Sequence, residues 1–209
     1  MIANTPKLAL PSPDELSRWL DTWHAEKDNS LTVSSVRHLF DTFPTNTNLD
    51  EILAKVAALD KLYSTSVRYP HDLARHIFSI PDLTLRLARG DISVVAEISN
   101  TPVVRRDGTS KTMCYYSIAT KYCAFSNPFV YSIYDSYVDR VLTEFNHLDP
   151  FFDAKKMDLR HYSDFDAVLD LFREKYSSVF ENVSRVDMDK YLWILGKTLF
   201  PKHYKRKSE

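Results

Sequence analysis

Apolar side chains recur along the chain at the spacing of helices rather than of strands. Leu16, Trp19, Leu20 and Trp23 follow the i, i+3, i+4, i+7 pattern of a single helix face. The segment before this stripe, Ser12–Glu15, has a serine, then a proline at the first helical position and a glutamate three residues after the serine. This combination is a capping box, so the pattern predicts a helix that begins immediately after the serine.

Similar stripes occupy most of the remaining chain and predict roughly nine helices. Asn48 with Glu51 is expected to open one helix, Gly90 to close another and Asp91 to cap the next. We therefore expect an all-α fold, a single compact multi-helix domain with residues 1–65 as an N-terminal helical region and residues 66–209 as the main helical domain. The stripes lie within 33–43, 52–63, 138–145, 165–176 and 191–199.

One segment does not follow the helical pattern. Residues 101–109 include Asp107-Gly108, the strongest two-residue turn signal in the chain, and they are expected to form at most a small β-hairpin. A helix is expected to start directly afterwards, at Ser110, and to run to about Phe125. The loop Ser126-Asn127-Pro128 would end it.

The scarcity of glycine excludes several classes of function. The chain contains only Gly90, Gly108 and Gly196, whereas loops that cradle phosphate need glycines to bring backbone amides close to the phosphate. P-loop and Rossmann chemistry are therefore excluded, and hairpin-rich β folds are not expected. The apolar content of 44% is enough for a hydrophobic core.

Cysteine spacing and hydropathy indicate the compartment. Cys114 and Cys123 lie nine residues apart in one predicted helix and would face different ways, so no disulfide is expected. No Cys/His spacing matches a zinc site, and we expect neither a metal nor a cofactor. No apolar run is long enough to cross a membrane, and the N-terminal residues lack a signal-peptide pattern. We therefore expect a cytoplasmic or nucleoid-associated protein that does not bind membranes.

The net charge of −1 is lower than that of most nucleic-acid-binding proteins. Basic residues nevertheless gather at the C-terminus and near residue 105, which leaves room for one positive face. If the protein binds DNA, we expect that face to contact phosphates through Arg105, Arg106, Lys202, Lys205, Arg206 and Lys207.

Asp135 supports two interpretations. It directly precedes an amphipathic helix, where a carboxylate caps the first turn and complements the helix dipole. It also follows the aromatic run Tyr131–Tyr134, and apolar neighbours could raise its pKa or place it in a pocket of the size of a base. Both the structural and the catalytic interpretation remain open on the sequence alone.

Two lysines are candidates for chemistry. Lys121 lies in SIATKYCAF, where it either extends to the surface or is held in an apolar environment that would lower its pKa and make it a nucleophile. Lys111 lies at the expected start of the same helix, where a cation opposes the helix dipole. It would be either exposed or in contact with a charged partner.

The block SKTMCYYSIATKYCAFSNPFVYSIYDSYVDRVL, residues 110–142, resembles the catalytic segment of the helix-hairpin-helix DNA glycosylases. The archaeal 8-oxoguanine glycosylases are the most similar members. These all-α proteins have a lysine at a helix start, a proline-containing loop and an aspartate that caps the next helix. Asp135 falls at the position of that aspartate, and the lysine would be Lys121 or Lys111. The family's glycine-rich hairpin is absent, and Ile133-Tyr134 replaces the proline before the aspartate.

The resemblance implies a DNA glycosylase that flips a damaged or modified base out of double-stranded DNA and cleaves its N-glycosidic bond. We expect a monomer in which Asp135 stabilises charge on the sugar and Lys121, or else Lys111, attacks it. The alternative is a non-catalytic all-α interaction module, or a defence-associated one, that retains the fold. The aromatic side chains expected to stack on the base are Tyr116, Phe125, Tyr131 and Tyr134.

Overall fold

The computed structural model describes residues 7–105 and 107–201, and three of its helices begin or end at capping signals that the sequence shows. Ser12 Oγ accepts a hydrogen bond from the amide of Glu15 at 3.2 Å, and Asn48 caps its helix in the same way. Gly90 ends α5 in a left-handed conformation (φ 76°), which favours glycine. The helices are α1 (Pro13–Ala25), α2 (Lys27–Thr42), α3 (Leu49–Tyr63), α4 (Pro70–Ser79), α5 (Leu83–Arg89), α6 (Ser93–Ser99), α7 (Tyr116–Ser126), α8 (Ser136–Leu148), α9 (Tyr162–Lys175), α10 (Ser177–Phe180) and α11 (Arg185–Leu199).

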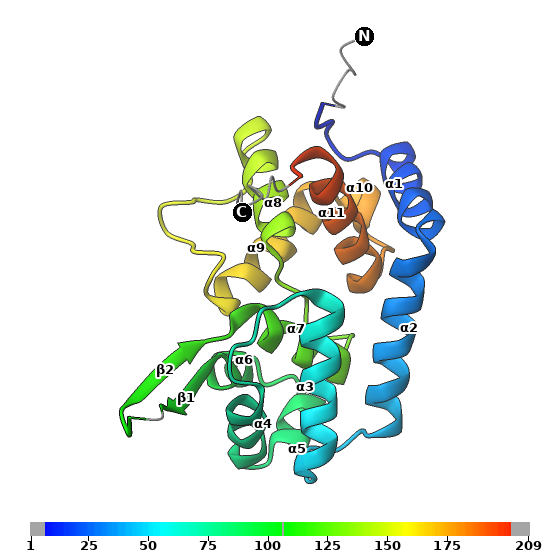
Figure 1. Cartoon of the computed structure of the whole chain (residues 1–209). Coiled ribbons are helices and arrows are strands. Elements are labelled where there is room, and N and C mark those ends of the chain that lie inside the picture. Colours follow the sequence, from blue (N-terminus) through cyan, green and yellow to red (C-terminus); the bar gives the residue numbers. More distant parts are fainter. Residues whose placement is uncertain (1–6, 106, 202–209) are drawn as a thin grey trace, which may run out of the picture.

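The protein is predominantly helical, as predicted, and the described residues also include the expected small hairpin. Strands β1 (Asn100–Val104) and β2 (Ser110–Cys114) pair antiparallel around a turn at Gly108 (φ 80°). The hairpin extends away from the helices (Figure 1).

The predicted start of a helix at Ser110 is wrong. Residues from Ser110 to Cys114 pair with β1, and the amide of Tyr115 donates to the carbonyl of Ser99 at 2.8 Å. These hydrogen bonds hold the chain extended, so α7 begins only at Tyr116. Cys114 is therefore an exposed strand residue, whereas Cys123 is buried in α7, and both thiols are free.

The helices form two lobes (Figure 1). One lobe contains α3 to α7 and the hairpin, and the other contains α1 and α8 to α11. Helix α2 runs along one side of the molecule and packs against α1, α3 and α7. The sequence divided the chain into an N-terminal region, residues 1–65, and a main domain, residues 66–209. Helices of the two regions pack against each other, α1 against α11 and α3 against α4.

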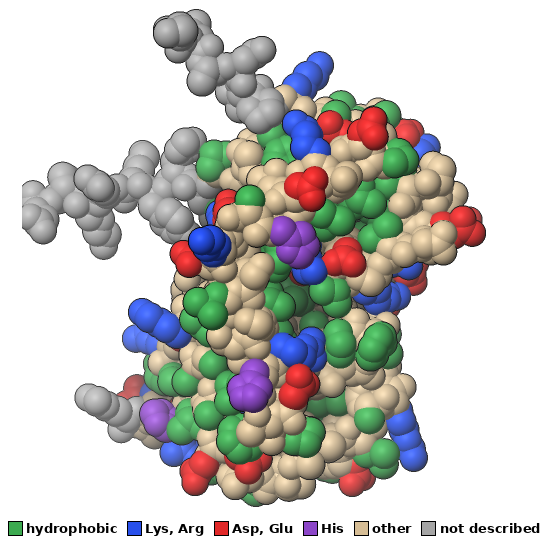
Figure 2. All heavy atoms as spheres, turned by 90° about the vertical axis from the view of Figure 1, so that its right-hand side faces the viewer, with side chains coloured by type: hydrophobic (Ala, Val, Ile, Leu, Met, Phe, Trp, Pro, Cys, Tyr) green, Lys and Arg blue, Asp and Glu red, His purple; other side chains and the backbone are tan. Residues whose placement is uncertain are grey.

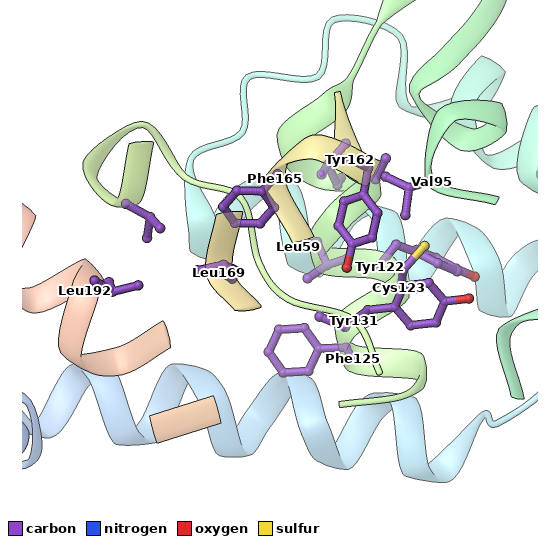
Figure 3. Close-up of a cluster of buried hydrophobic side chains, with 14 of the residues drawn as sticks. Leu59, Val95, Tyr122, Cys123, Phe125, Tyr131, Tyr162, Phe165, Leu169 and Leu192 are labelled. Atoms are coloured by element: carbon purple, nitrogen blue, oxygen red, sulfur yellow. The ribbon is translucent and has the colours of Figure 1, made fainter. Parts of the chain in front are cut away.

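One hydrophobic core extends through both lobes. Figure 3 shows Leu59, Val95 and Tyr122 of the first lobe in the same cluster as Phe165, Leu169 and Leu192 of the second. A shared core fixes the two lobes against each other, because core packing tolerates little rearrangement. Within the described ranges, no helix has the length and apolar character that a membrane span requires.

Candidate functional site

A cavity of about 560 Å³ lies where the two lobes meet. Its walls come from α2, α7, α11 and the segment 128–137 that joins the lobes. The face that carries α2 narrows and is hollowed at mid-height, with hydrophobic and basic side chains around the hollow (Figure 2). A cavity of this size is within the usual range for a small-molecule site.

Asp135 enters this cavity from the N-terminus of α8. Its backbone is extended (φ −139°, ψ 151°), and its Oδ1 accepts a hydrogen bond from the amide of Tyr137 at 2.8 Å. The preceding segment is held by hydrogen bonds from the amide of Tyr134 to Thr120 Oγ1 and from the amide of Ser132 to the Tyr162 hydroxyl. The carboxylate is therefore both an N-cap and a fixed cavity group.

The position of α8 depends on a close contact with α11. A Cβ atom added to Gly196 would lie 2.7 Å from the carbonyl oxygen of Tyr137, closer than non-bonded atoms approach. The first turn of α8, and with it Asp135, can take this position because residue 196 has no side chain.

Lys121 lies opposite Asp135 on α7, and the two side chains form an ion pair with 3.8 Å between Lys121 Nζ and Asp135 Oδ2. Nζ also donates to Ser117 Oγ at 2.9 Å and to the carbonyl of Tyr134 at 3.2 Å. The residue is 1% exposed. Of the two interpretations of this lysine, the structure shows the buried one.

Asp189 on α11 is a second carboxylate of the cavity, and the sequence interpretation missed it. Although its side chain is partly exposed, protein surrounds the carboxyl, and this desolvation raises the pKa of Asp189 to about 7. Lys121 lowers that pKa and Asp135 raises it, which shows that the three charges interact. Asp189 lies three residues before Leu192 and four before Trp193, so the three side chains share one face of α11. This spacing is the sequence signal that the aspartate faces inward.

Aromatic side chains form much of the cavity wall. Phe125, Tyr131 and Tyr134, three of the four residues expected to stack on a base, lie in this wall, and Phe125 lies beside α2 (Figure 3). Tyr116 is not in the wall. Its ring lies 4.6 Å from that of Tyr134, and its hydroxyl donates to the carbonyl of Leu159. The residues expected to stack on the base did not include four further aromatic wall residues: Trp23, Tyr63, Tyr137 and Trp193.

The structure does not bring Lys111 or Arg105 to the cavity. Lys111 is exposed on β2 opposite Val103, and Arg105 is exposed at the hairpin turn. Neither lines the cavity. Arg106, Lys202, Lys205, Arg206 and Lys207 lie outside the described residues.

Basic side chains from other elements take part in the wall. Arg185 is bound by Asp166 and Asp170, and Lys190 by Asp187. Arg37 donates to the carbonyl of Phe125 at 2.7 Å, and no carboxylate of the described chain lies within ion-pair distance of it. Groups of three or more His, Cys, Asp or Glu side chains that could hold a metal ion are absent from the part of the chain that the structure describes.

Comparison with known proteins gives a family and a relative. Residues 15–130 match the HI_0787 N-terminal domain family. An uncharacterized protein of Haemophilus influenzae is 37% identical over 170 residues, which cover 81% of this chain and 76% of the relative. No solved structure matches. The family match spans more than half of the chain, and the relative is 37% identical over most of it. The protein therefore belongs to the HI_0787 N-terminal domain family.

Proposed function

We propose that the protein is a DNA glycosylase-like enzyme that excises a damaged or modified base. One observation carries the proposal: a buried lysine and an N-cap aspartate form an ion pair inside an aromatic-walled cavity. A lysine and a fixed carboxylate are the groups needed for attack on a sugar carbon and for stabilising the charge that develops there. Double-stranded DNA as partner, a monomeric state and a location in the cytoplasm or nucleoid belong to the same proposal.

The cavity suits a base that has been flipped out of the duplex. Flipped bases are held by stacking on flat side chains and by hydrogen bonds to their edges. Phe125 and Trp193 supply flat apolar surfaces, and Asp189 supplies a polar group beside them. The cavity volume leaves room for a purine or a pyrimidine together with part of its sugar.

In the proposed reaction, Lys121 first gives up a proton, and its amine then attacks C1′ of the sugar. The lone pair of the amine forms the N–C1′ bond, while the electron pair of the N-glycosidic bond leaves with the base, which takes up a proton. The attacking nitrogen then loses a proton, and its lone pair forms the C=N bond as the C1′–O4′ bond breaks. The electron pair of that bond stays on O4′, which takes up a proton, and the imine joins the lysine to the opened sugar. The Asp135 carboxylate stabilises positive charge on the sugar during bond cleavage.

Asp189 is suited to accept the first proton. A group whose pKa lies near the working pH both accepts and returns protons efficiently, and burial brings the pKa of Asp189 to about 7. If Lys121 is not the nucleophile, Asp135 would activate a water molecule instead. Base release would then occur with no covalent intermediate.

The second candidate function is a non-catalytic interaction module that retains the fold. The position of the hairpin favours it, because Arg105 was expected to bind DNA phosphates and Lys111 was a candidate nucleophile, and neither lies at the cavity. Among the residues that line the cavity, Arg37 is the basic group best placed to contact a phosphate.

The proposal is tested by borohydride trapping on duplex oligonucleotides that carry different modified bases. Borohydride reduces an imine to a stable amine, so a lysine nucleophile should give a covalent protein–DNA product. Lys111→Gln, a change at an exposed lysine outside the cavity, should leave the yield unchanged. If every duplex fails to release a base and fails to bind at low salt, the enzyme proposal is wrong and the interaction module is favoured.

Salt-dependent DNA binding gives a second test. Removing one phosphate contact lowers the slope of log affinity against log salt by roughly one unit. Arg37→Gln should produce this change if the cavity mouth faces the DNA. Arg105→Gln tests the face predicted from the sequence. A lower salt slope in this variant, with an unchanged slope in Arg37→Gln, would indicate that DNA binds at the hairpin.

A further inference from the structure

Tyr63 has a hydroxyl group that the protein itself does not use. The oxygen is buried and has no hydrogen-bond partner among the described residues, although the side chain lines the cavity. Buried polar groups are nearly always paired, because an unpaired donor loses its hydrogen bonds to water and gains none in return. An unpaired hydroxyl in the wall of a cavity therefore points to a partner on the ligand.

The ring of Tyr63 is held in one place. Tyr63 is the last residue of α3, and Ser64 then turns the chain in a left-handed conformation (φ 52°). The ring packs against Phe125, with 5.8 Å between ring centroids, and Lys121 Nζ lies 5.7 Å from its centre. A hydroxyl on a fixed ring can select ligands by the position of their hydrogen-bonding atoms.

We propose that the Tyr63 hydroxyl recognises the ligand by donating a hydrogen bond to a ring carbonyl oxygen. The inference rests on the proposed function and narrows its substrate class to bases that carry a carbonyl group on the recognised edge. Bases with an amino group at the same position would bind more weakly, because the hydroxyl oxygen could accept from the amino group but the hydroxyl proton would then have no acceptor among the described residues.

The other polar groups of the cavity explain why a donor is needed. Asp135 and Asp189 supply acceptors, while the Arg37 guanidinium donates to the carbonyl of Phe125 and the Lys121 ammonium to Ser117 and Tyr134. Burial raises the pKa of Tyr63, and the nearby Asp189 raises it further, although Arg37 opposes them. The hydroxyl therefore keeps its proton and remains available as a donor.

A matched control exists in the same protein. Tyr191 also has a buried hydroxyl with no partner among the described residues, but its ring packs against Phe180 in the core and does not line the cavity. Tyr63→Phe and Tyr191→Phe each remove one oxygen atom from a buried ring. Only the first variant changes the wall of the cavity.

The test measures the binding of free bases by quenching of tryptophan fluorescence, since Trp23 and Trp193 lie in the cavity wall. Hypoxanthine and adenine form one pair that differs by carbonyl against amino, and uracil and cytosine form the other. We expect the wild type to prefer the carbonyl member of at least one pair. Tyr63→Phe should weaken binding of that base about tenfold, weaken binding of its amino counterpart by a smaller factor and leave the melting temperature equal or higher. Tyr191→Phe should bind as the wild type does.

Three outcomes would overturn the inference: unchanged carbonyl preference in Tyr63→Phe, no binding of any of the four bases by the wild type, or a loss of thermal stability in Tyr63→Phe that Tyr191→Phe does not show. Free-base binding requires no DNA cleavage. A protein that excises bases from DNA but fails this test would therefore refute the role of Tyr63 alone. A protein that binds carbonyl bases without excising them would support the role of Tyr63 and refute the proposed enzyme activity.

Discussion

Two buried lysines, Lys55 and Lys121, show how little burial alone says about function. Each is 1% exposed, and each ammonium group lies near aromatic rings. Lys55 Nζ donates to the carbonyl of Thr45 at 2.9 Å and to Asn46 Oδ1 at 3.4 Å. Both partners are neutral, and none of the described carboxylates lies within ion-pair distance of Lys55. Lys121, in contrast, has the carboxylate of Asp135 at 3.8 Å.

The two lysines also differ in their access to a ligand. Lys121 lines the cavity between the lobes, whereas Lys55 does not. Lys55 instead joins α3 to the core through Asn46, whose Oδ1 also accepts a 2.5 Å hydrogen bond from the Tyr122 hydroxyl. A cavity and a carboxylate, rather than burial, therefore distinguish the proposed nucleophile from the structural lysine.

The largest expected effect is the loss of the borohydride-trapped product in Lys121→Gln. The amide can replace the neutral hydrogen bonds of the lysine but cannot form an imine. Lys55→Gln is the matched change in the other lysine and should keep the trapped product. If both variants, or neither, lose the adduct while remaining folded, the distinction between the two lysines is wrong.

Asp135→Asn should cut base excision by about two orders of magnitude or more. Asparagine caps a helix as well as aspartate does, so the free energy of unfolding should change by no more than about 1 kcal/mol. The variant removes the carboxylate that lies 3.8 Å from Lys121 Nζ and so makes this lysine more similar to Lys55. Excision kinetics and chemical denaturation measure the two effects, and full activity or an unfolded protein would contradict the dual role of Asp135.

Lys55 should make stability depend on pH. Burial lowers its pKa in the folded protein to about 8 from 10.5, although Glu51 opposes the shift. Below pH 8 both states carry the proton, and the cost of burying the charge is fully present. Between pH 8 and 10.5 the unfolded state binds more protons, so the free energy of unfolding should rise by roughly 3 kcal/mol.

Lys55→Met removes this titration and provides the comparison. Denaturation of both proteins from pH 7 to pH 10.5 should show the rise in the wild type and its loss in the variant. Parallel curves would show that Lys55 keeps its proton in the folded protein and is solvated more fully than its position in the core suggests.

The smallest expected effect is a severalfold rise in excision as the pH increases from 6 to 8. Asp189, with its pKa raised to about 7, would ionise over this range and become able to accept the proton of Lys121. Asp189→Asn should flatten the pH profile, measured as single-turnover excision at saturating enzyme. A variant with the profile of the wild type would exclude Asp189 as the proton acceptor.

Local signals made the helical class and most helix boundaries predictable. Ser12, Asn48 and Gly90 act within one or two turns of their own helices, and a side chain that bonds its own neighbours can be recognised in sequence. The start of α7 was not predictable in this way. Residues 110–114 are held extended by hydrogen bonds to β1, and these depend on a partner strand.

The candidate site was predictable only in part, for the same reason. Lys121 is conspicuous as the one charged residue in an apolar helix, and Asp135 marks a helix start. Tyr63 and Asp189 become cavity residues only because α3 and α11 meet α7 in three dimensions. Lys55 could have been noticed, because it lies three residues after Ile52 and four before Leu59 on the buried face of α3.

The contact between Gly196 and Tyr137 restricts which substitutions this protein can accept at residue 196 during evolution. A side chain at residue 196 would need to displace the first turn of α8, although the residue has no functional group and does not line the cavity. Substitutions there should be purged as strictly as those at Asp135. Saturation mutagenesis scored by activity would therefore mark residue 196 as intolerant, and a search for reactive side chains alone would overlook it.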